Sequence, residues 1–190
     1  MNDLELWQAL RRGDKQALET IYRTHAAALL KYGNKFVADG QLVEDCLQDL
    51  FIEIWQKGHN LSDTDSIKRY LFVALRRKIV RQLERKIKRI ANEEPKEQQF
   101  HAEISIDEHL IQEELGQEQA QKIQHAMKNL SERQREAIYL KYFSGMDYPT
   151  IAEIMDINYQ SVRNLVFNAI KNMRKYVQVM FLLVWSYFIY

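Results

Sequence analysis

The chain has 190 residues and a formal net charge of +1 at pH 7, so one or two small domains are expected and the total charge points to no partner. Cys46 is the single cysteine, which excludes an internal disulfide and a multi-cysteine zinc site. The first residues lack the basic start and apolar run of a signal peptide, so we expect a cytoplasmic protein.

The distribution of charge along the chain is more informative than its total. Bases dominate from Lys68 to Arg89, and acids dominate from Ala91 to Gln121. A basic block followed by an acidic block suggests a polyanion-binding face beside a solvated connector. Because basic runs are often ordinary solvated helix faces, this pattern alone does not establish nucleic-acid binding.

Helical periodicity dominates residues 1–90, and no stretch alternates apolar and polar residues for long, so we expect an all-α fold. A short helix ends near Gly13, and Asp14 can cap a second helix. A third helix spans about residues 41–57, and Gly58 suits its end. After a polar loop, a long helix capped by Asp65 or Ser66 is expected to reach about residue 90. The predicted apolar stripe of the second helix comprises Ala17, Leu18, Ile21, Tyr22, Ala28, Leu29, Tyr32 and Phe36.

The chain is predicted to have four parts. Residues 1–90 form a helical bundle, and residues 91–109 form an acidic linker that contains Pro95 and lacks an apolar stripe. Residues 110–176 form a second helical unit, and residues 177–190 form an apolar C-terminal tail.

The second unit contains the strongest local signal. Its first helix is expected at about 110–129, and Ser131 with Gln134 forms a capping box for the next helix. Asp147 can cap a short helix that tolerates Pro149 in its first turn. A tight turn at 156–158 then leads to a last helix from Tyr159. Two short helices joined by such a turn indicate a helix-turn-helix.

The last helix is predicted to present polar side chains outward, of the types that donate to phosphates and to base edges in a major groove. These candidate DNA contacts are Tyr159, Gln160, Ser161, Arg163, Asn164, Asn168, Lys171 and Arg174. On the pattern alone, an ordinary helical hairpin with a polar exterior remains the alternative.

Three stretches resemble a known family. Region 4 of extracytoplasmic-function sigma factors, of the sigma-70 family, closely resembles residues 130–165, LSERQREAIYLKYFSGMDYPTIAEIMDINYQSVRNL. The clamp-binding helix of region 2 resembles residues 43–55, VEDCLQDLFIEIW, and the helix that engages the −10 element resembles residues 70–78, YLFVALRRK. The set is most similar to the sigma factors of Bacteroidetes. Family members often carry Asn at the place of Arg77, Glu at the place of Pro149 and Gly at the place of Asp156.

The resemblance implies a two-domain helical sigma subunit whose partners are core RNA polymerase (clamp and flap), promoter DNA and an anti-sigma factor. The residues between 59 and 66 would hold a base flipped out of the −10 element, and the last helix would read the −35 element. The implied polymerase contacts are Asp45, Gln48, Asp49, Phe51, Ile54 and Trp55, of which Phe51 and Trp55 can equally be core residues. The implied −10 contacts are Asn60, Ser62, Lys68, Arg69, Tyr70, Arg76, Arg77 and Arg81.

No enzyme, cofactor or metal site is expected. The five histidines share no metal-like spacing with one another or with Cys46, and the chain has no glycine-rich phosphate loop. The apolar tail is shorter than a membrane span of ~20 residues, so a membrane anchor is the second choice. We expect the tail to pack on the chain's own domains or on a partner, because a fully apolar helix must be covered.

Two rival hypotheses remain at this point. A helix-turn-helix regulator that binds DNA without polymerase explains residues 130–176 but neither of the other two stretches. A membrane-associated helical interaction protein explains the tail but neither basic face.

Overall fold

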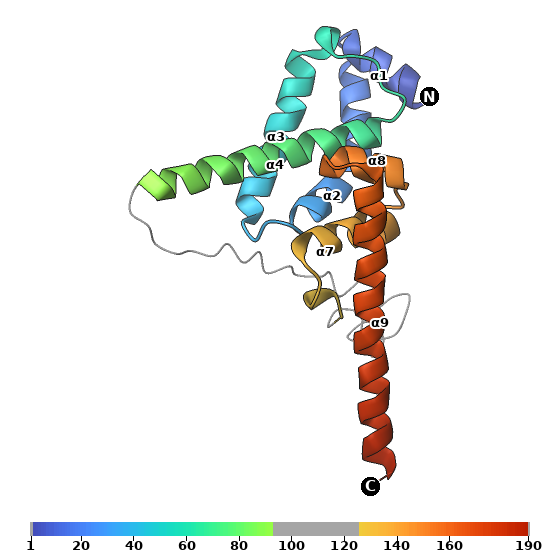
Figure 1. The fold of residues 1–190 in the computed structure, drawn as a ribbon. Helices are drawn as coiled ribbons and strands as arrows, with labels where there is room; N and C mark the ends of the chain where they lie inside the picture. Colours follow the sequence, from blue (N-terminus) through green and yellow to red (C-terminus); the bar gives the residue numbers. More distant parts are fainter. Residues whose placement is uncertain (1, 93–125, 190) are drawn as a thin grey trace. The chain divides into compact units, whose positions relative to one another are not determined.

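The computed structural model describes residues 2–92 and 126–189, with side chains given up to residue 88 and from 126 to 174. Every regular element in these ranges is a helix or a helical turn, in agreement with the predicted all-α fold (Figure 1). The chain divides into two compact units, Met1–Glu103 and Ile104–Tyr190. The boundary between them, most of the predicted acidic linker and nearly all of the predicted helix at 110–129 lie outside the described residues.

The first unit is a bundle in which three long helices pack against one another. These are α2 (Lys15–Gly33), α3 (Gly40–Gln56) and α4 (Ile67–Asn92). The short α1 (Asp3–Arg11) packs on α2 and α4 and on the single turn η1 (Gly58–Asn60). Gly33 allows α2 and α3 to approach closely, because a Cβ there would lie 2.3 Å from Val43 Cγ1.

Capping side chains set where the helices of the first unit begin. Asp14 accepts hydrogen bonds from the backbone N–H groups of the first turn of α2, and Asp39 does so for α3. Ser66 Oγ accepts from Arg69 N at 3.2 Å, so Ser66 rather than Asp65 caps α4. The α3 helix thus begins at Gly40, directly after its cap Asp39.

The buried face of α2 differs in part from the predicted stripe. Ile21, Leu29 and Tyr32 are fully buried as expected. Ala28 is exposed and Tyr22 is 46 % exposed, whereas Ala26 is buried. Because α2 packs against α1, α3 and α4 along its length, its buried surface does not follow one straight stripe.

The second unit contains α7 (Glu132–Ile138), the π-helical turn η2 (Tyr139–Phe143), α8 (Tyr148–Met155) and α9 (Tyr159–Ile189). The predicted capping box is confirmed, since Ser131 Oγ accepts from Gln134 N and Gln134 Oε1 accepts from Ser131 N. The α7 helix continues directly into η2, in which Tyr142 is 58 % exposed.

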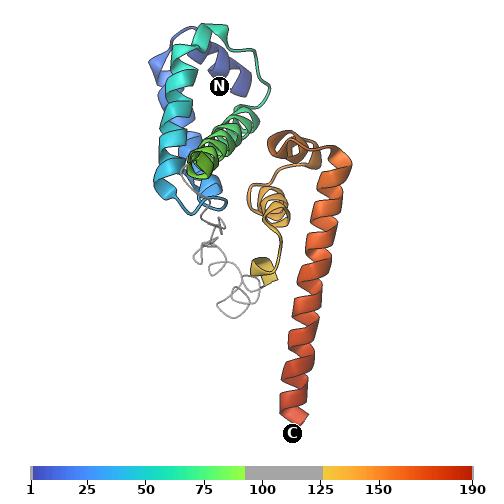
Figure 2. The ribbon, with the colours of Figure 1, turned by 60° about the vertical axis from the view of Figure 1, so that its left-hand side comes forward.

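The last helix is longer than a helix-turn-helix requires. It runs without a break to Ile189 and so includes the backbone of residues 177–189, which extends beyond α7 and α8 of the same unit (Figure 2). The expected packing of this tail concerns side chains outside the described set. Within the described residues, we find no helix with both the length and the apolar character that crossing a membrane requires.

Candidate functional site

Three local features set the start of α8, the end of α8 and the start of α9. Asp147 Oδ1 accepts from Thr150 N at 3.0 Å and begins α8, and its hydrogen bonds with Thr150 lower the pKa of the Asp147 carboxyl. Asp156 ends α8 in the left-handed conformation, with φ 54° and ψ 49°. Asn158 Oδ1 accepts from Ser161 N at 2.7 Å and caps α9. The α8 and α9 helices pack on each other across this turn, as a helix-turn-helix needs.

The small core of this motif consists of apolar residues from both helices. Ile151, Ile154, Met155, Val162 and Val166 are buried. Residues 157 and 165 are partly buried. The buried face of α9 therefore follows the expected helical spacing.

The outer face of α9 presents the predicted polar residues. Gln160 Nε2 donates to Asn164 Oδ1 at 3.2 Å, and the Arg163 guanidinium lies 5.9 Å from the centre of the Tyr159 ring. Ser161 is partly buried, and its backbone N–H is used in the cap. Exposed residues on this face are Tyr159, Gln160, Arg163, Asn164, Asn168, Lys171 and Arg174.

Sequence reasoning missed one residue of this helix. Phe167 is 67 % exposed, the highest value among the exposed large apolar side chains of the described residues. Phe167 directly follows the buried Val166 and does not fall at the helical spacing of the buried residues. The sequence pattern could therefore have predicted that Phe167 is exposed. A contact surface that includes this ring is more apolar than the predicted one.

The α3 helix offers a second surface, which is smaller than predicted. Asp45, Gln48 and Asp49 are exposed, and Trp55 is 36 % exposed. A large apolar residue that the sequence reading did not select, Ile52, is 53 % exposed. These polar and apolar side chains are spaced by three and four residues, so they share one face of α3.

Two predicted residues of α3 do not belong to this surface. Phe51 is 7 % exposed and Ile54 is 1 % exposed, because both face the bundle core between α2 and α4. The Phe51 ring packs edge-on against Tyr22, with the ring centres 4.9 Å apart. Phe51 is thus a core residue, one of the two readings left open above.

The third surface consists of the loop after α3 and the start of α4. Asn60 and Ser62 are exposed, as are Arg77 and Arg81 further along α4. Lys68, Arg69 and Arg76 are partly buried, and the Arg69 guanidinium forms an ion pair with Asp65. Of the five predicted cations, the two that are exposed are therefore those farthest from the loop along the sequence.

Tyr70 is partly buried against another ring of the first unit. Its ring centre lies 4.7 Å from that of Trp7, at an interplanar angle of 59°. Burial raises the pKa of the Tyr70 hydroxyl, and the nearby Glu53 carboxylate adds to this. The Trp7 ring therefore covers part of the Tyr70 ring.

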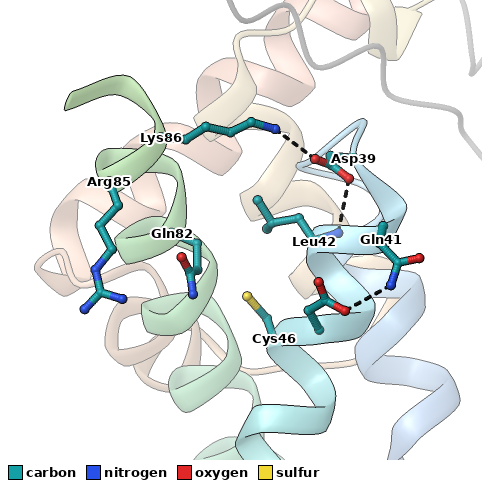
Figure 3. A pocket seen from close by; sticks show the side chains of 8 residues that line it. Asp39, Gln41, Leu42, Cys46, Gln82, Arg85 and Lys86 are labelled. Atoms are coloured by element: carbon teal, nitrogen blue, oxygen red, sulfur yellow. Dashed lines mark hydrogen bonds and ion pairs between the residues drawn. The ribbon is translucent and has the colours of Figure 1, made fainter. Parts of the chain in front are cut away.

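A pocket of about 500 Å³ lies between the start of α3 and the C-terminal half of α4 (Figure 3). Lys86 Nζ of α4 lies 3.0 Å from Asp39 Oδ2 on the opposite side of the pocket, and on α3 itself Gln41 Nε2 donates to Asp45 Oδ1 at 2.9 Å. Cys46 also lines the pocket, and burial raises the pKa of its thiol, which keeps the sulfur protonated and unreactive. Asp45 and Arg85 also line this pocket, which therefore carries two acidic and two basic side chains.

In the part of the chain that the structure describes, no three His, Cys, Asp or Glu side chains come together in a way that could hold a metal ion.

Two family models match the chain in the order that the resemblance predicted. The model for Sigma-70 region 2 matches residues 21–89, and the model for Sigma-70, region 4 matches residues 120–173. Together they cover more than half of the chain. The chain therefore belongs to the sigma-70 family.

Similar proteins narrow this class to the ECF sigma factors. The ECF RNA polymerase sigma factor SigK of Mycolicibacterium vanbaalenii is 23 % identical over 91 % of this chain and 87 % of its own length. The RNA polymerase sigma-H factor of Pseudomonas aeruginosa is 23 % identical over 93 % of this chain and 94 % of its own length.

Two solved structures share the fold. CnrH, in complex with the cytosolic domain of CnrY, has a TM-score of 0.62 at 16 % identity, covering 93 % of this chain and 97 % of that one. The sigma factor RpoE of Bartonella quintana, in complex with the anti-sigma factor NepR, has a TM-score of 0.59 at 22 % identity, covering 87 % and 96 %. Sigma factors are DNA-recognition regulators rather than enzymes.

Proposed function

We propose that this chain binds core RNA polymerase and directs it to promoters with defined −10 and −35 elements. The observation that carries this proposal is the pairing, in one chain and in family order, of the α3–α4 unit with a helix-turn-helix whose α9 face is polar and exposed. We propose a separate binding role for each of the three surfaces.

The α3 surface is proposed to bind the clamp helices of the polymerase. Helix-on-helix recognition combines apolar anchors with flanking polar contacts. Trp55 and Ile52 supply the exposed apolar area, and Asp45, Gln48 and Asp49 supply the polar contacts. Phe51 and Ile54 support this helix from inside the bundle.

The loop after α3 is proposed to hold a base extruded from the −10 element. Extrusion costs a few kcal/mol of stacking, and least in a strand that is already melting. Asn60 and Ser62 are exposed in this loop, and Arg77 and Arg81 on α4 can attract the backbone of the displaced strand. In this proposal the loop and the basic face of α4 bind the same displaced DNA strand.

The α9 face is proposed to read the −35 duplex. In a helix-turn-helix, the N-terminal residues of the second helix enter the major groove. Tyr159, Gln160, Arg163 and Asn164 occupy these positions, whereas Asn168, Lys171 and Arg174 lie farther along α9 and are placed for phosphates.

An anti-sigma factor is proposed to control this chain in the cytoplasm. The support is the solved relative RpoE, whose structure was determined with the anti-sigma factor NepR. The similarity to sigma factors of Bacteroidetes rests on the residues quoted above. The tail at 177–190 is proposed as a contact for a partner such as an anti-sigma domain or the polymerase flap, with membrane contact less favoured.

Reconstitution with bacterial core polymerase tests the proposed function. We expect transcription from a specific start site only when both the core enzyme and this chain are present. Tight binding of the chain alone to a duplex site, without promoter-dependent transcription, would favour the rival hypothesis of a lone helix-turn-helix regulator. The hypothesis of a lone regulator does not explain the exposed surface of α3.

A further inference from the structure

The loop between α3 and α4 is held by a helix outside the part of the chain that matches region 2. The match begins at residue 21, whereas α1 covers Asp3–Arg11. In Figure 1, α1 (dark blue) lies beside the connection from α3 to α4, and hydrogen bonds join the two segments. The α1 helix contacts this connection at its beginning, in its middle and at its end.

Two side chains of α1 hold the middle of the loop. Trp7 Nε1 donates a hydrogen bond to the carbonyl oxygen of Ser62 at 2.9 Å. The Arg11 guanidinium forms an ion pair with Asp63, the next residue. The Trp7 side chain is fully buried, and a buried indole N–H needs an acceptor. A displaced loop would leave this N–H without its partner.

The two ends of the loop also contact α1. Asp3 Oδ2 accepts from the N–H of Ile67, the first residue of α4, at 2.9 Å. At the other end, a Cβ on Gly58 would lie 3.3 Å from the carbonyl oxygen of Leu10, so the backbone of η1 sits directly against the end of α1. The loop is thus fixed relative to both flanking helices.

These contacts hold the backbone and leave recognition groups accessible. Ser62 uses its carbonyl oxygen toward Trp7, while the residue itself is exposed. His59 and Asn60 are exposed as well. A site that discriminates between bases needs its contact groups held in position before binding, because a loop that can shift also adjusts to a wrong base and reduces the penalty for binding it.

We propose that α1 is a positioning element for the −10 loop, in which Trp7 and Arg11 set the loop backbone and thereby sharpen discrimination between bases at the extruded position. This inference rests on the proposed role of the loop. Neither residue touches DNA in this account, because both act through the backbone and the carboxylate of the loop.

The experiment measures transcription by core polymerase with the full-length chain on templates that differ only in the base at the extruded −10 position. The readout is the ratio of the best to the worst template. Trp7→Phe keeps a ring against Tyr70 and removes the N–H, and Arg11→Gln removes the ion pair. Arg12→Gln is the matched control, since it deletes the same charge from the exposed neighbouring residue.

The ratio is expected to fall about tenfold for Trp7→Phe and Arg11→Gln, the size of one specific base contact. We expect it to stay unchanged for Arg12→Gln and to be largely restored in Arg11→Lys, which keeps the charge. Core binding and the thermal midpoint should be unaffected in Arg11→Gln, whose side chain is partly exposed, so this variant carries the test if Trp7→Phe folds poorly.

An unchanged ratio in Arg11→Gln, or an equal loss of transcription on all templates, overturns the inference, because either outcome shows that α1 only supports folding. If the wild-type chain gives no promoter-dependent transcription at all, the proposed function fails, and this inference fails with it. The wild-type reaction therefore separates the two failures.

Discussion

The Nζ of Lys78 lies 2.5 Å from Oε1 of Glu53, and this ion pair joins α4 to α3. The helix proposed to contact the −10 strand is thereby tied to the helix proposed to bind the polymerase. Lys78 is 18 % exposed at its side chain and Glu53 is 49 % exposed, so solvent screens the pair only in part.

Removing this ion pair is predicted to have a small and pH-dependent effect on stability. The hydrogen bond with Lys78 is the largest of the effects that lower the pKa of Glu53 below its ordinary value of 4.5. The ion pair therefore stabilises the fold fully at pH values above 4.5. Its contribution is lost as the pH falls through the pKa that Glu53 has in the folded state. Glu53→Gln should lower the free energy of unfolding at pH 7 by no more than about 1 kcal/mol.

Urea unfolding at neutral and acidic pH measures this effect. The matched control is Glu84→Gln, an exposed acid on α4. A Glu53→Gln loss that persists undiminished in acid would contradict the assignment to the ion pair.

The left-handed residue at the end of α8 gives a second prediction. Asp156 adopts φ 54°, a conformation that glycine reaches without strain and β-branched residues resist. Asp156→Gly should therefore be neutral or stabilise the second unit by up to about 1 kcal/mol, whereas Asp156→Val should destabilise it by about 1–2 kcal/mol.

Native-state hydrogen exchange of amides in α8 and α9 reports on this unit directly. The opposite order of the two variants would show that the Asp156 side chain, rather than the backbone conformation, stabilises the turn.

A histidine of α2 gives a third prediction. His25 is partly buried, and its burial lowers its pKa below the ordinary value of 6.5; Asp3 opposes this shift and Lys68 reinforces it. The unfolded chain takes up a proton at higher pH than the folded chain does. The stability that neutral His25 contributes is therefore complete above 6.5 and is lost as the pH falls through the folded-state pKa.

His25→Gln should flatten the dependence of the urea midpoint on pH between about 7.5 and about 5.5. The lowered carboxyl pKa values of Asp39, Glu53 and Asp147 belong to a more acidic range, so they do not mask the effect. Equal pH profiles for the variant and the wild type would contradict this prediction.

The division of labour between the two units gives a fourth prediction. Arg163→Ala should weaken the dependence of transcription on the −35 sequence, and loss of a base contact costs about 1–3 kcal/mol. Trp55→Ala should weaken binding to core polymerase, because a partly exposed indole is a typical anchor of an interface.

Core binding by fluorescence anisotropy and transcription on −35 variants separate the two effects. The control is Lys57→Ala, which removes an exposed side chain near the end of α3. If both Arg163→Ala and Trp55→Ala lost only folding stability, the assigned roles would be wrong.

Local signals made the helix-turn-helix predictable from the sequence. Asp147, Asn158 and the Ser131 capping box act within three residues of their partners, so their effect is visible in the sequence itself. The cap at Ser66 was predicted for the same reason, as one of two adjacent candidates.

Contacts between distant residues were not predictable in this way. The hydrogen bond from Trp7 to Ser62 joins residues 55 positions apart, and periodicity carries no information about such a pair. Likewise, the α3 pattern identified an amphipathic helix but did not tell whether Phe51 or Ile52 faces the bundle, because adjacent residues at the edge of an apolar stripe differ only in their packing.

Strand opening at the −10 element is the most direct test of the central claim, that one chain recruits polymerase and acts on two promoter elements. Permanganate modifies unpaired thymines, so it reports opening in a complex of core polymerase, this chain and a promoter that contains both elements. We predict reactive thymines in the −10 non-template strand only when core and chain are both present, and a loss of this reactivity when the −35 element is replaced. Protection of duplex DNA by the chain alone, with no opening when core polymerase is added, would contradict the account.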